Sequence, residues 1–293
     1  MSVNSSFNSS GSSVHLPIVC IESTPGIFIF VAFFVANVFL LPLFILVLYL
    51  GYRRGRQQRP GSAAGMTSHS DIFTYNMMGL ELISVLGCCF YCCGALTNVK
   101  VMISVGMYVF SITSPGQTLF HLLTCVERYL AVVHPITYLG LRQAGGVRIR
   151  NISIGCVWLF SLGSPVLTKV CLGSYAASVL LGFSLLAVSF CSISVLSVLI
   201  RPRQREVGGK REQVDQTKLR AFYTIVAIMG ALVLRFAGIL FSHAVYSSIL
   251  TEDSCVVGLS LFWLTLPSSL VLPLLFLHRA GRLPGCERST EPG

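Results

Sequence analysis

Long apolar stretches separated by short polar segments dominate this chain. A helix that crosses the hydrocarbon core of a bilayer needs about 20 mostly apolar residues. Each such stretch is expected to be helical, because lipid offers no water to unpaired backbone groups. We therefore predict an all-α membrane protein, a bundle of seven transmembrane helices at residues 27–50, 72–94, 101–126, 151–172, 175–200, 221–246 and 255–277.

The fourth and fifth stretches are separated by little more than Gly173 and Ser174. Together they cover about 50 residues, which is too long for one span of about 20 residues. We therefore predict two helices here. Residues 1–26 form an N-terminal tail and residues 278–293 a C-terminal tail on either side of the bundle.

The positions of the charged residues indicate how the chain is oriented in the membrane, and they do not indicate a nucleic-acid partner. Only 11% of the residues are charged and 54% are hydrophobic, whereas a soluble domain carries roughly 25% charged residues. The net charge of +10 would indicate nucleic acid if it were taken alone, but 18 of the 21 basic residues lie in the odd-numbered connections and the C-terminal tail. Because basic loops remain in the cytoplasm, the N-terminus is predicted to be extracellular.

Two glycosylation acceptors agree with this orientation. Asn4 and Asn8 each begin an Asn-Ser-Ser triplet, and such acceptors mark extracellular segments. Both lie on the side predicted to be outside the cell, so we expect a glycoprotein.

The end of the third stretch carries the most specific motif. Residues 124–138 read TCVERYLAVVHPITY. This segment resembles the E/DRY motif and second intracellular loop of rhodopsin-like (class A) G-protein-coupled receptors. The resemblance implies a plasma-membrane receptor coupled to heterotrimeric G proteins, and it implies that Glu127, Arg128, Tyr129 and Pro135 form the coupling and switch region.

Further landmarks of that family lie in the other stretches. Asn37 matches its buried asparagine in the first helix, Glu81 replaces its usual aspartate in the second, and Trp158 matches its tryptophan in the fourth. By the resemblance, Asn37, Glu81 and Ser269 are core polar residues, and a sodium ion near Glu81 is a candidate ligand.

Several positions depart from the family pattern. Ile103 stands where the family has the cysteine of its conserved disulfide, and the sixth stretch has no CWxP sequence. The seventh ends in Leu272-Pro273 and Phe276, a degraded NPxxY. These departures weaken the transfer of the family's activation mechanism to this chain.

Two ionisable residues, Glu81 and Arg235, lie deep within predicted spans. Charges at this depth are costly and usually face the bundle interior with a partner. Three interpretations remain open. The two residues form an ion pair, Glu81 belongs to a sodium site with Ser114 and Ser269, or Arg235 anchors an anionic extracellular ligand.

The third stretch also supplies candidate pocket residues. Phe110 occupies the position at which amine receptors of the resembled family carry an aspartate, which argues against an amine ligand. We expect Tyr108, Phe110, Ser111 and Ser114, together with Arg235, to line a ligand pocket. Packing of these residues between helices is the alternative.

The eleven cysteines are expected to serve in packing and disulfides, and no metal site is expected. The resemblance implies a disulfide between Cys20 and Cys255, because some receptors of the family link the N-terminal segment to the third outer loop. Cys171 is left unpaired or paired with Cys92 or Cys93. Cys286 in the basic tail is a candidate for palmitoylation.

Taken together, the sequence predicts a receptor that binds an extracellular ligand and activates heterotrimeric G proteins. No nucleophile motif indicates an enzyme. A decoy or scaffold that retains the fold without signalling is the alternative favoured by the degraded motifs. A transporter is disfavoured because we find no internal repeat.

Overall fold

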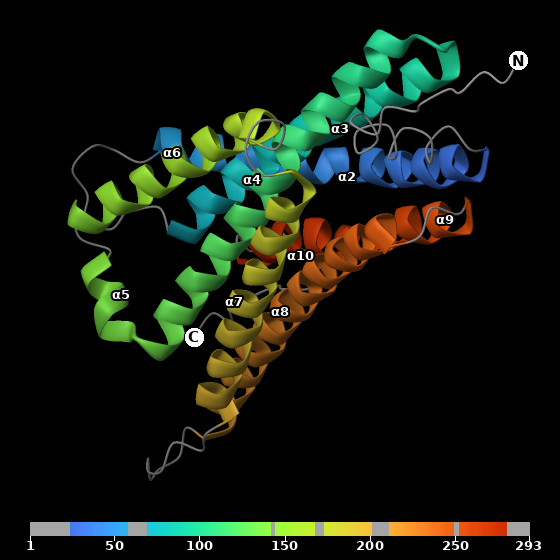
Figure 1. The fold of residues 1–293 in the computed structure, drawn as a ribbon. Coiled ribbons are helices and arrows are strands. Elements are labelled where there is room, and N and C mark those ends of the chain that lie inside the picture. Colours follow the sequence, from blue (N-terminus) through green and yellow to red (C-terminus); the bar gives the residue numbers. More distant parts are fainter. Residues whose placement is uncertain are drawn as a thin grey trace, which may run out of the picture.

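The computed structural model describes residues 24–57, 69–141, 144–167, 173–200, 211–248 and 252–279. Helices make up nearly all of this described part, and it contains no β-strand. Figure 1 shows the long helices packed as a bundle. The elements are α2 (Thr24–Gln57), α3 (His69–Thr97), α4 (Lys100–Val133), α5 (Pro135–Leu141), α6 (Ala144–Leu167), α7 (Gly173–Ile200), α8 (Arg211–Ser248), α9 (Glu252–Leu261), the 3₁₀ helix η3 (Phe262–Thr265) and α10 (Leu266–Arg279).

Four segments of the described residues are long and apolar enough to cross a membrane. They lie in α2, in α3, in α7 and across α9 to α10, and they correspond to the first, second, fifth and seventh predicted spans: Pro25–Arg53, Asp71–Thr97, Ser178–Val198 and Val256–Leu277. In α8 a shorter apolar segment, Val226–Ser242, overlaps the sixth predicted span. The third and fourth predicted spans are helical in α4 and α6. These two helices are less apolar and are not among the segments counted as able to cross a membrane.

The outer surface of the bundle is apolar. Phe39 of α2 is 79% exposed, Leu159 of α6 is 73% exposed and Leu186 of α7 is 72% exposed. Soluble monomers rarely expose apolar patches larger than a few hundred Å². Exposed side chains of this kind on separate helices therefore support a membrane protein.

Residues 151–200 fall in two described helices, since α6 is described up to Leu167 and α7 from Gly173. The seventh predicted span differs from a continuous helix. Its middle residues, Phe262–Thr265, form the 3₁₀ helix η3 between α9 and α10. A 3₁₀ helix has a tighter turn than an α-helix, so η3 changes the direction in which the side chains after it point.

A short connection makes α3 and α4 an antiparallel pair. Asn98 has a positive φ of 56°, and the amide of Val99 donates to the carbonyl of Gly94 at 3.0 Å. This is the left-handed geometry that commonly ends a helix, and asparagine adopts it more readily than most residues. The chain therefore turns back within two residues, and α4 packs along α3.

Close backbone contact holds the two helices together. A Cβ atom placed on Gly106 of α4 would lie 2.7 Å from the carbonyl oxygen of Gly87 and 2.7 Å from the backbone nitrogen of Tyr91, both on α3. Only glycine fits at this crossing. Small residues allow the same close approach of helices in membranes, where van der Waals packing drives helix association.

The hydrophobic core runs along the centre of the bundle. Its fully buried side chains include Phe44 from α2, Met77 from α3, Phe120 from α4, Val188 from α7 and Phe236 from α8. In Figure 1, α7 and α8 run side by side along much of their length. The core thus connects both halves of the chain around a central polar region.

Several predicted features lie outside the described residues. They include the glycosylation acceptors Asn4 and Asn8, the half-cystine Cys20, the unassigned Cys171 and the palmitoylation candidate Cys286. Cys255 lies in α9, but its side chain is not among those described. The Cys20–Cys255 disulfide therefore stays a prediction.

Candidate functional site

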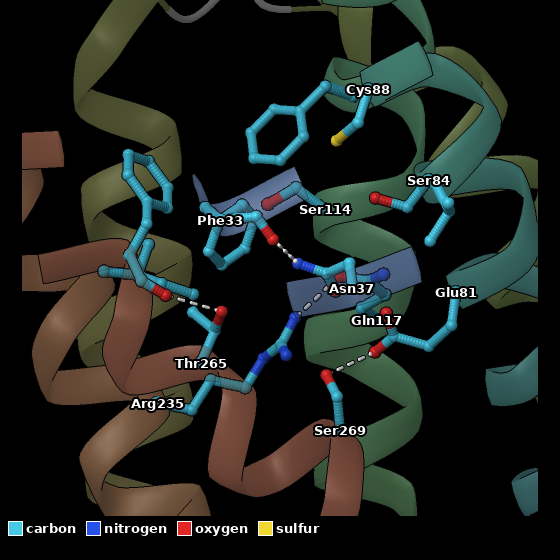
Figure 2. Close-up of a pocket in the computed structure, with 14 residues that line it drawn as sticks. Phe33, Asn37, Glu81, Ser84, Cys88, Ser114, Gln117, Arg235, Thr265 and Ser269 are labelled. Atoms are coloured by element: carbon cyan, nitrogen blue, oxygen red, sulfur yellow. Dashed lines mark hydrogen bonds between the residues drawn. The ribbon is translucent and has the colours of Figure 1, made fainter. Parts of the chain in front are cut away.

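A polar cavity lies at the point where the long helices meet. Its volume is about 30 Å³, enough for about one or two water molecules. Figure 2 shows its lining side chains converging from helices that are far apart in the sequence. They are Phe33 and Asn37 of α2, Glu81, Ser84, Val85 and Cys88 of α3, Phe110, Ser114 and Gln117 of α4, Arg235 and Ile239 of α8, Phe262 and Thr265 of η3, and Ser269 of α10.

Arg235 is the basic residue of this cavity and is only 3% exposed. Its Nη1 donates to the Ser268 hydroxyl at 3.1 Å, and its Nη2 donates to the Gln117 side-chain oxygen at 2.6 Å. The guanidinium group therefore joins α8 to α4 and to α10. Hydrogen bonds that involve a charged group are stronger than those between neutral groups, so these contacts fix the position of α8 in the bundle.

Glu81 is the acidic residue of the same cavity and is also 3% exposed. Its Oε1 accepts a hydrogen bond from the Ser269 hydroxyl at 2.9 Å. Glu81 makes no ion pair within 4.0 Å of Arg235 in the described part of the chain, although the two charges act on each other. The carboxylate and the guanidinium therefore face one cavity from α3 and α8, each held by neutral polar partners.

The helical spacing of the polar residues brings them to this point. Ser114 and Gln117 are three residues apart in α4, and Thr265 and Ser268 are three residues apart around the end of η3. Residues three or four apart share a face of a helix. The sequence therefore contains a spacing that places Gln117, Thr265 and Ser268 beside other polar residues. They were not predicted as site residues, because, unlike Glu81 and Arg235, they carry no charge.

The structure brings part of the predicted pocket together. Phe110, Ser114 and Arg235 line the cavity with Glu81, and the Phe110 ring contacts the Phe262 ring edge-to-face with centroids 6.0 Å apart. Aromatic side chains therefore line the cavity together with the two charged residues.

Tyr108 and Ser111 lie elsewhere on α4. Tyr108 is 51% exposed, and Ser111 is exposed and donates to the Tyr108 carbonyl at 2.7 Å. Neither residue lines the cavity. The face of α4 that carries them points away from the polar centre.

Asn37 is the remaining predicted core residue at the cavity. It is buried, and its amide nitrogen donates to the carbonyl of Phe33 one turn earlier at 2.8 Å. Asn37 also lines the cavity. Asn37, Glu81 and Ser269 thus meet at one site, although they come from three separate helices.

A second polar contact joins α3 to α6. The indole nitrogen of Trp158 donates to the side-chain oxygen of Asn76 at 3.0 Å, while Asn76 donates to the carbonyl of Ile72 at 2.9 Å. The Trp158 ring also contacts the Phe120 ring with centroids 6.5 Å apart. Asn76 of α3 and Trp158 of α6 therefore bind each other beside the core.

The end of α4 carries the charged motif. Glu127 is buried, at 8% exposed, and its Oε1 accepts a hydrogen bond from the Tyr138 hydroxyl of α5 at 3.2 Å. The neighbouring Arg128 and Tyr129 are half-buried. Pro135 begins α5 and is exposed. Glu127 is thus bound to the helix that follows the motif.

Tyr129 lies against α7 and the start of α5. Its ring centroid is 6.0 Å from that of Phe190 and 5.6 Å from that of His134. The Tyr129 hydroxyl and His134 Nε2 are 3.3 Å apart. The motif therefore sits where α4, α5 and α7 meet.

The histidine and cysteine residues of the described part do not gather into a metal site. His121 is fully buried one turn after Gln117, and neither ring nitrogen has a hydrogen-bond partner among the described residues. The side chain of His243 is not among those described. Cys88 and Cys92 are buried, whereas Cys89 and Cys93 are exposed on the other face of α3.

No protein-family model matches this chain, and no curated protein matches it.

Proposed function

We propose that the chain is a rhodopsin-like G-protein-coupled receptor of the plasma membrane with seven transmembrane helices. In this proposal α2, α3, α4, α6, α7, α8 and the α9–α10 segment cross the membrane. The N-terminus lies outside, and the basic connections lie in the cytoplasm. An extracellular ligand enters the cavity beside Phe110 and Phe262.

The hydrogen bond between Glu127 and Tyr138 is the observation that carries the proposal. It binds the acidic residue of the charged motif to α5, directly beside Arg128. A switch requires an element with two arrangements whose balance a ligand can shift. Release of Glu127 from this contact would change the surroundings of Arg128, which we propose contacts the G protein.

The cavity supports the receptor proposal in a second way. A ligand site in a helical bundle is expected between its helices, with a few polar groups that orient the ligand. Here α4, α8 and α10 contribute to the same cavity and to the hydrogen bonds around Arg235. A ligand that displaced one of these contacts would act on the helices whose other ends we propose to meet the G protein.

An anionic ligand is one candidate class, because Arg235 is a buried cation beside the cavity. To bind a carboxylate or phosphate, its guanidinium would exchange a hydrogen bond to Gln117 or Ser268 for one to the ligand. Such an exchange replaces a neutral acceptor by a charged one, which gives a stronger bond. The receptor proposal itself requires no particular ligand class.

A decoy or scaffold of the same fold is the second candidate function. Leu272 and Phe276 are buried where the resembled family has the asparagine and tyrosine of NPxxY. These side chains pack in the core rather than provide polar groups. A bundle that lacks those groups can bind a ligand or partner without the signalling step.

A nucleotide-exchange assay distinguishes the two candidates. Membranes that contain the wild-type chain are mixed with purified heterotrimeric G proteins of each subtype, and the basal rate of nucleotide exchange is measured. We expect Glu127→Gln to raise this rate, because the loss of charge weakens the contacts that hold Glu127 in place. We expect Arg128→Ala to abolish it.

Arg148→Ala is the matched control, since Arg148 is an exposed arginine in α6. It removes one predicted cytoplasmic charge without touching the motif, and we expect it to leave the rate unchanged. Equal surface expression of all variants is verified first. If neither wild type nor Glu127→Gln accelerates exchange on any G protein, the receptor proposal fails and the decoy or scaffold is favoured.

A further inference from the structure

Two opposite charges face the central cavity without direct contact. Glu81 and Arg235 are each 3% exposed, and they are the charged residues among those that line the cavity in the described part of the chain. Each acts electrostatically on the other. Burial of a single charge is very costly, whereas two opposite charges in one buried site compensate each other. The cavity therefore has a balanced formal charge.

The oxygen atoms around Glu81 would suit a small cation. The carboxylate, the Ser269 hydroxyl and the Ser114 hydroxyl belong to the cavity lining, and hard cations prefer oxygen ligands of this kind. The charge balance does not suit one. A sodium ion would share the cavity with the guanidinium group, and like charges in a poorly solvated site repel each other strongly.

The hydrogen bonds of Arg235 strengthen this conflict. Gln117 contributes its side-chain oxygen to Nη2, and Ser268 accepts from Nη1. Two polar groups near the cavity are thus already committed to the guanidinium. A free cation would have to compete for oxygen ligands with a cation that is attached to the chain.

We propose that Arg235 is a tethered counter-ion for Glu81, which closes the cavity to free monovalent cations. Removal of its charge converts the Glu81 cavity into a sodium site. The wild-type chain, in contrast, neutralises its buried carboxylate from within and does not respond to sodium.

The tether makes the neutralisation of Glu81 depend on helix position. Arg235 belongs to α8, Glu81 to α3, and the acceptors Gln117 and Ser268 to α4 and α10. The attraction between two opposite charges weakens as the distance between them increases. A displacement of α8 that withdraws the guanidinium therefore leaves Glu81 without its cation. If the proposed receptor function holds, this dependence opposes movement of α8 in the resting state.

A thermal-unfolding experiment tests the counter-ion directly. The full-length protein is purified in detergent, and its unfolding midpoint is compared in sodium chloride and in choline chloride at equal ionic strength. Choline is too large for a cavity of about 30 Å³, so it supplies ionic strength without a competing small cation. We expect no resolvable difference for wild type or for Arg235→Lys, since both retain a tethered cation.

Arg235→Met should instead become sodium-sensitive. A sodium concentration about tenfold above the dissociation constant stabilises the folded state enough to raise the midpoint by roughly 2–5 °C in a protein of this size. The double variant Glu81→Gln with Arg235→Met removes both charges. It should lose the sodium response and unfold at a higher temperature in choline than Arg235→Met alone, because it buries no unpaired carboxylate.

Two results would overturn the inference. The first is a sodium-dependent rise for wild type as large as that for Arg235→Met, and the second is a folded Arg235→Met without any sodium response. Where Arg235→Met does not fold, Arg235→Gln takes its place and is judged by the same criterion. The experiment contains no G protein, so its failure is distinguishable from failure of the receptor proposal.

Discussion

The crossing of α3 and α4 at Gly106 allows a sharp test of the packing that builds the cavity. In Gly106→Ala the new methyl group would lie 2.7 Å from the Gly87 carbonyl oxygen and 2.7 Å from both the nitrogen and the Cβ of Tyr91. Ordinary contacts of a Cβ atom begin at 3.4 Å. The two helices must therefore separate by about 0.7 Å, because two of the three obstructing atoms belong to the backbone of α3.

The expected magnitude follows from two opposing effects. Overpacking of a well-packed core costs about 1–3 kcal/mol. Replacement of glycine by alanine inside a helix returns about 0.5–1 kcal/mol through the lower backbone entropy of the unfolded chain. The net expectation is a destabilisation of about 1–2 kcal/mol. For a protein of this size that corresponds to a fall in unfolding midpoint of roughly 2–8 °C.

Gly79→Ala is the matched control in α3. A Cβ atom on Gly79 would meet no other heavy atom within 4 Å, so the same substitution should stabilise the protein by about 0.5–1 kcal/mol. Thermal unfolding of the two purified variants and wild type in detergent measures both changes. A Gly106→Ala midpoint at or above that of Gly79→Ala would refute the close crossing of α3 and α4.

Two other predictions concern the hydrogen bonds beside the core and at the motif. Trp158→Phe keeps a ring but removes the hydrogen bond to Asn76, and it should destabilise the protein by about 1–2 kcal/mol. A double-mutant cycle with Asn76→Ala, measured by thermal unfolding, tests this bond. If the effects of the two substitutions simply add, the bond contributes nothing to stability. Tyr138→Phe removes the hydroxyl that binds Glu127 and should raise basal nucleotide exchange, whereas Tyr108→Phe, at an exposed site, should not. An unchanged rate of nucleotide exchange for Tyr138→Phe would show that the hydrogen bond between Tyr138 and Glu127 is not part of the switch.

The sequence was sufficient for the helical character of the long apolar stretches, but it predicted neither α5 nor the 3₁₀ helix η3. The apolar stretches are long, so even the start of α7 at Gly173 lies within two residues of the predicted start at residue 175. Apolarity was less informative for α4. This helix buries Thr113, Gln117 and His121 in its middle, and such polar positions lower its mean hydropathy even though they face the protein interior.

The site was predicted only in part, for a physical reason. Glu81 and Arg235 stand out because charge is rare in an apolar stretch, and both line the cavity. The partners that hold them, Gln117, Ser268 and Ser269, are neutral, and only Ser269 was singled out. Which serine or amide meets a charge depends on the rotation of each helix about its axis, and local sequence does not determine that rotation.

The 3₁₀ helix η3 sets the rotation of α10 about its axis relative to α9. Each residue of a 3₁₀ helix turns about 120°, against about 100° in an α-helix, so four residues advance the following helix by about 80°. This advance lets Gly258 accept from Ser242 of α8 before η3, while Ser268 and Ser269 bind Arg235 and Glu81 after it. If η3 relaxed into α-helical geometry, α10 would rotate by that angle and carry both serines away from both charges in one movement.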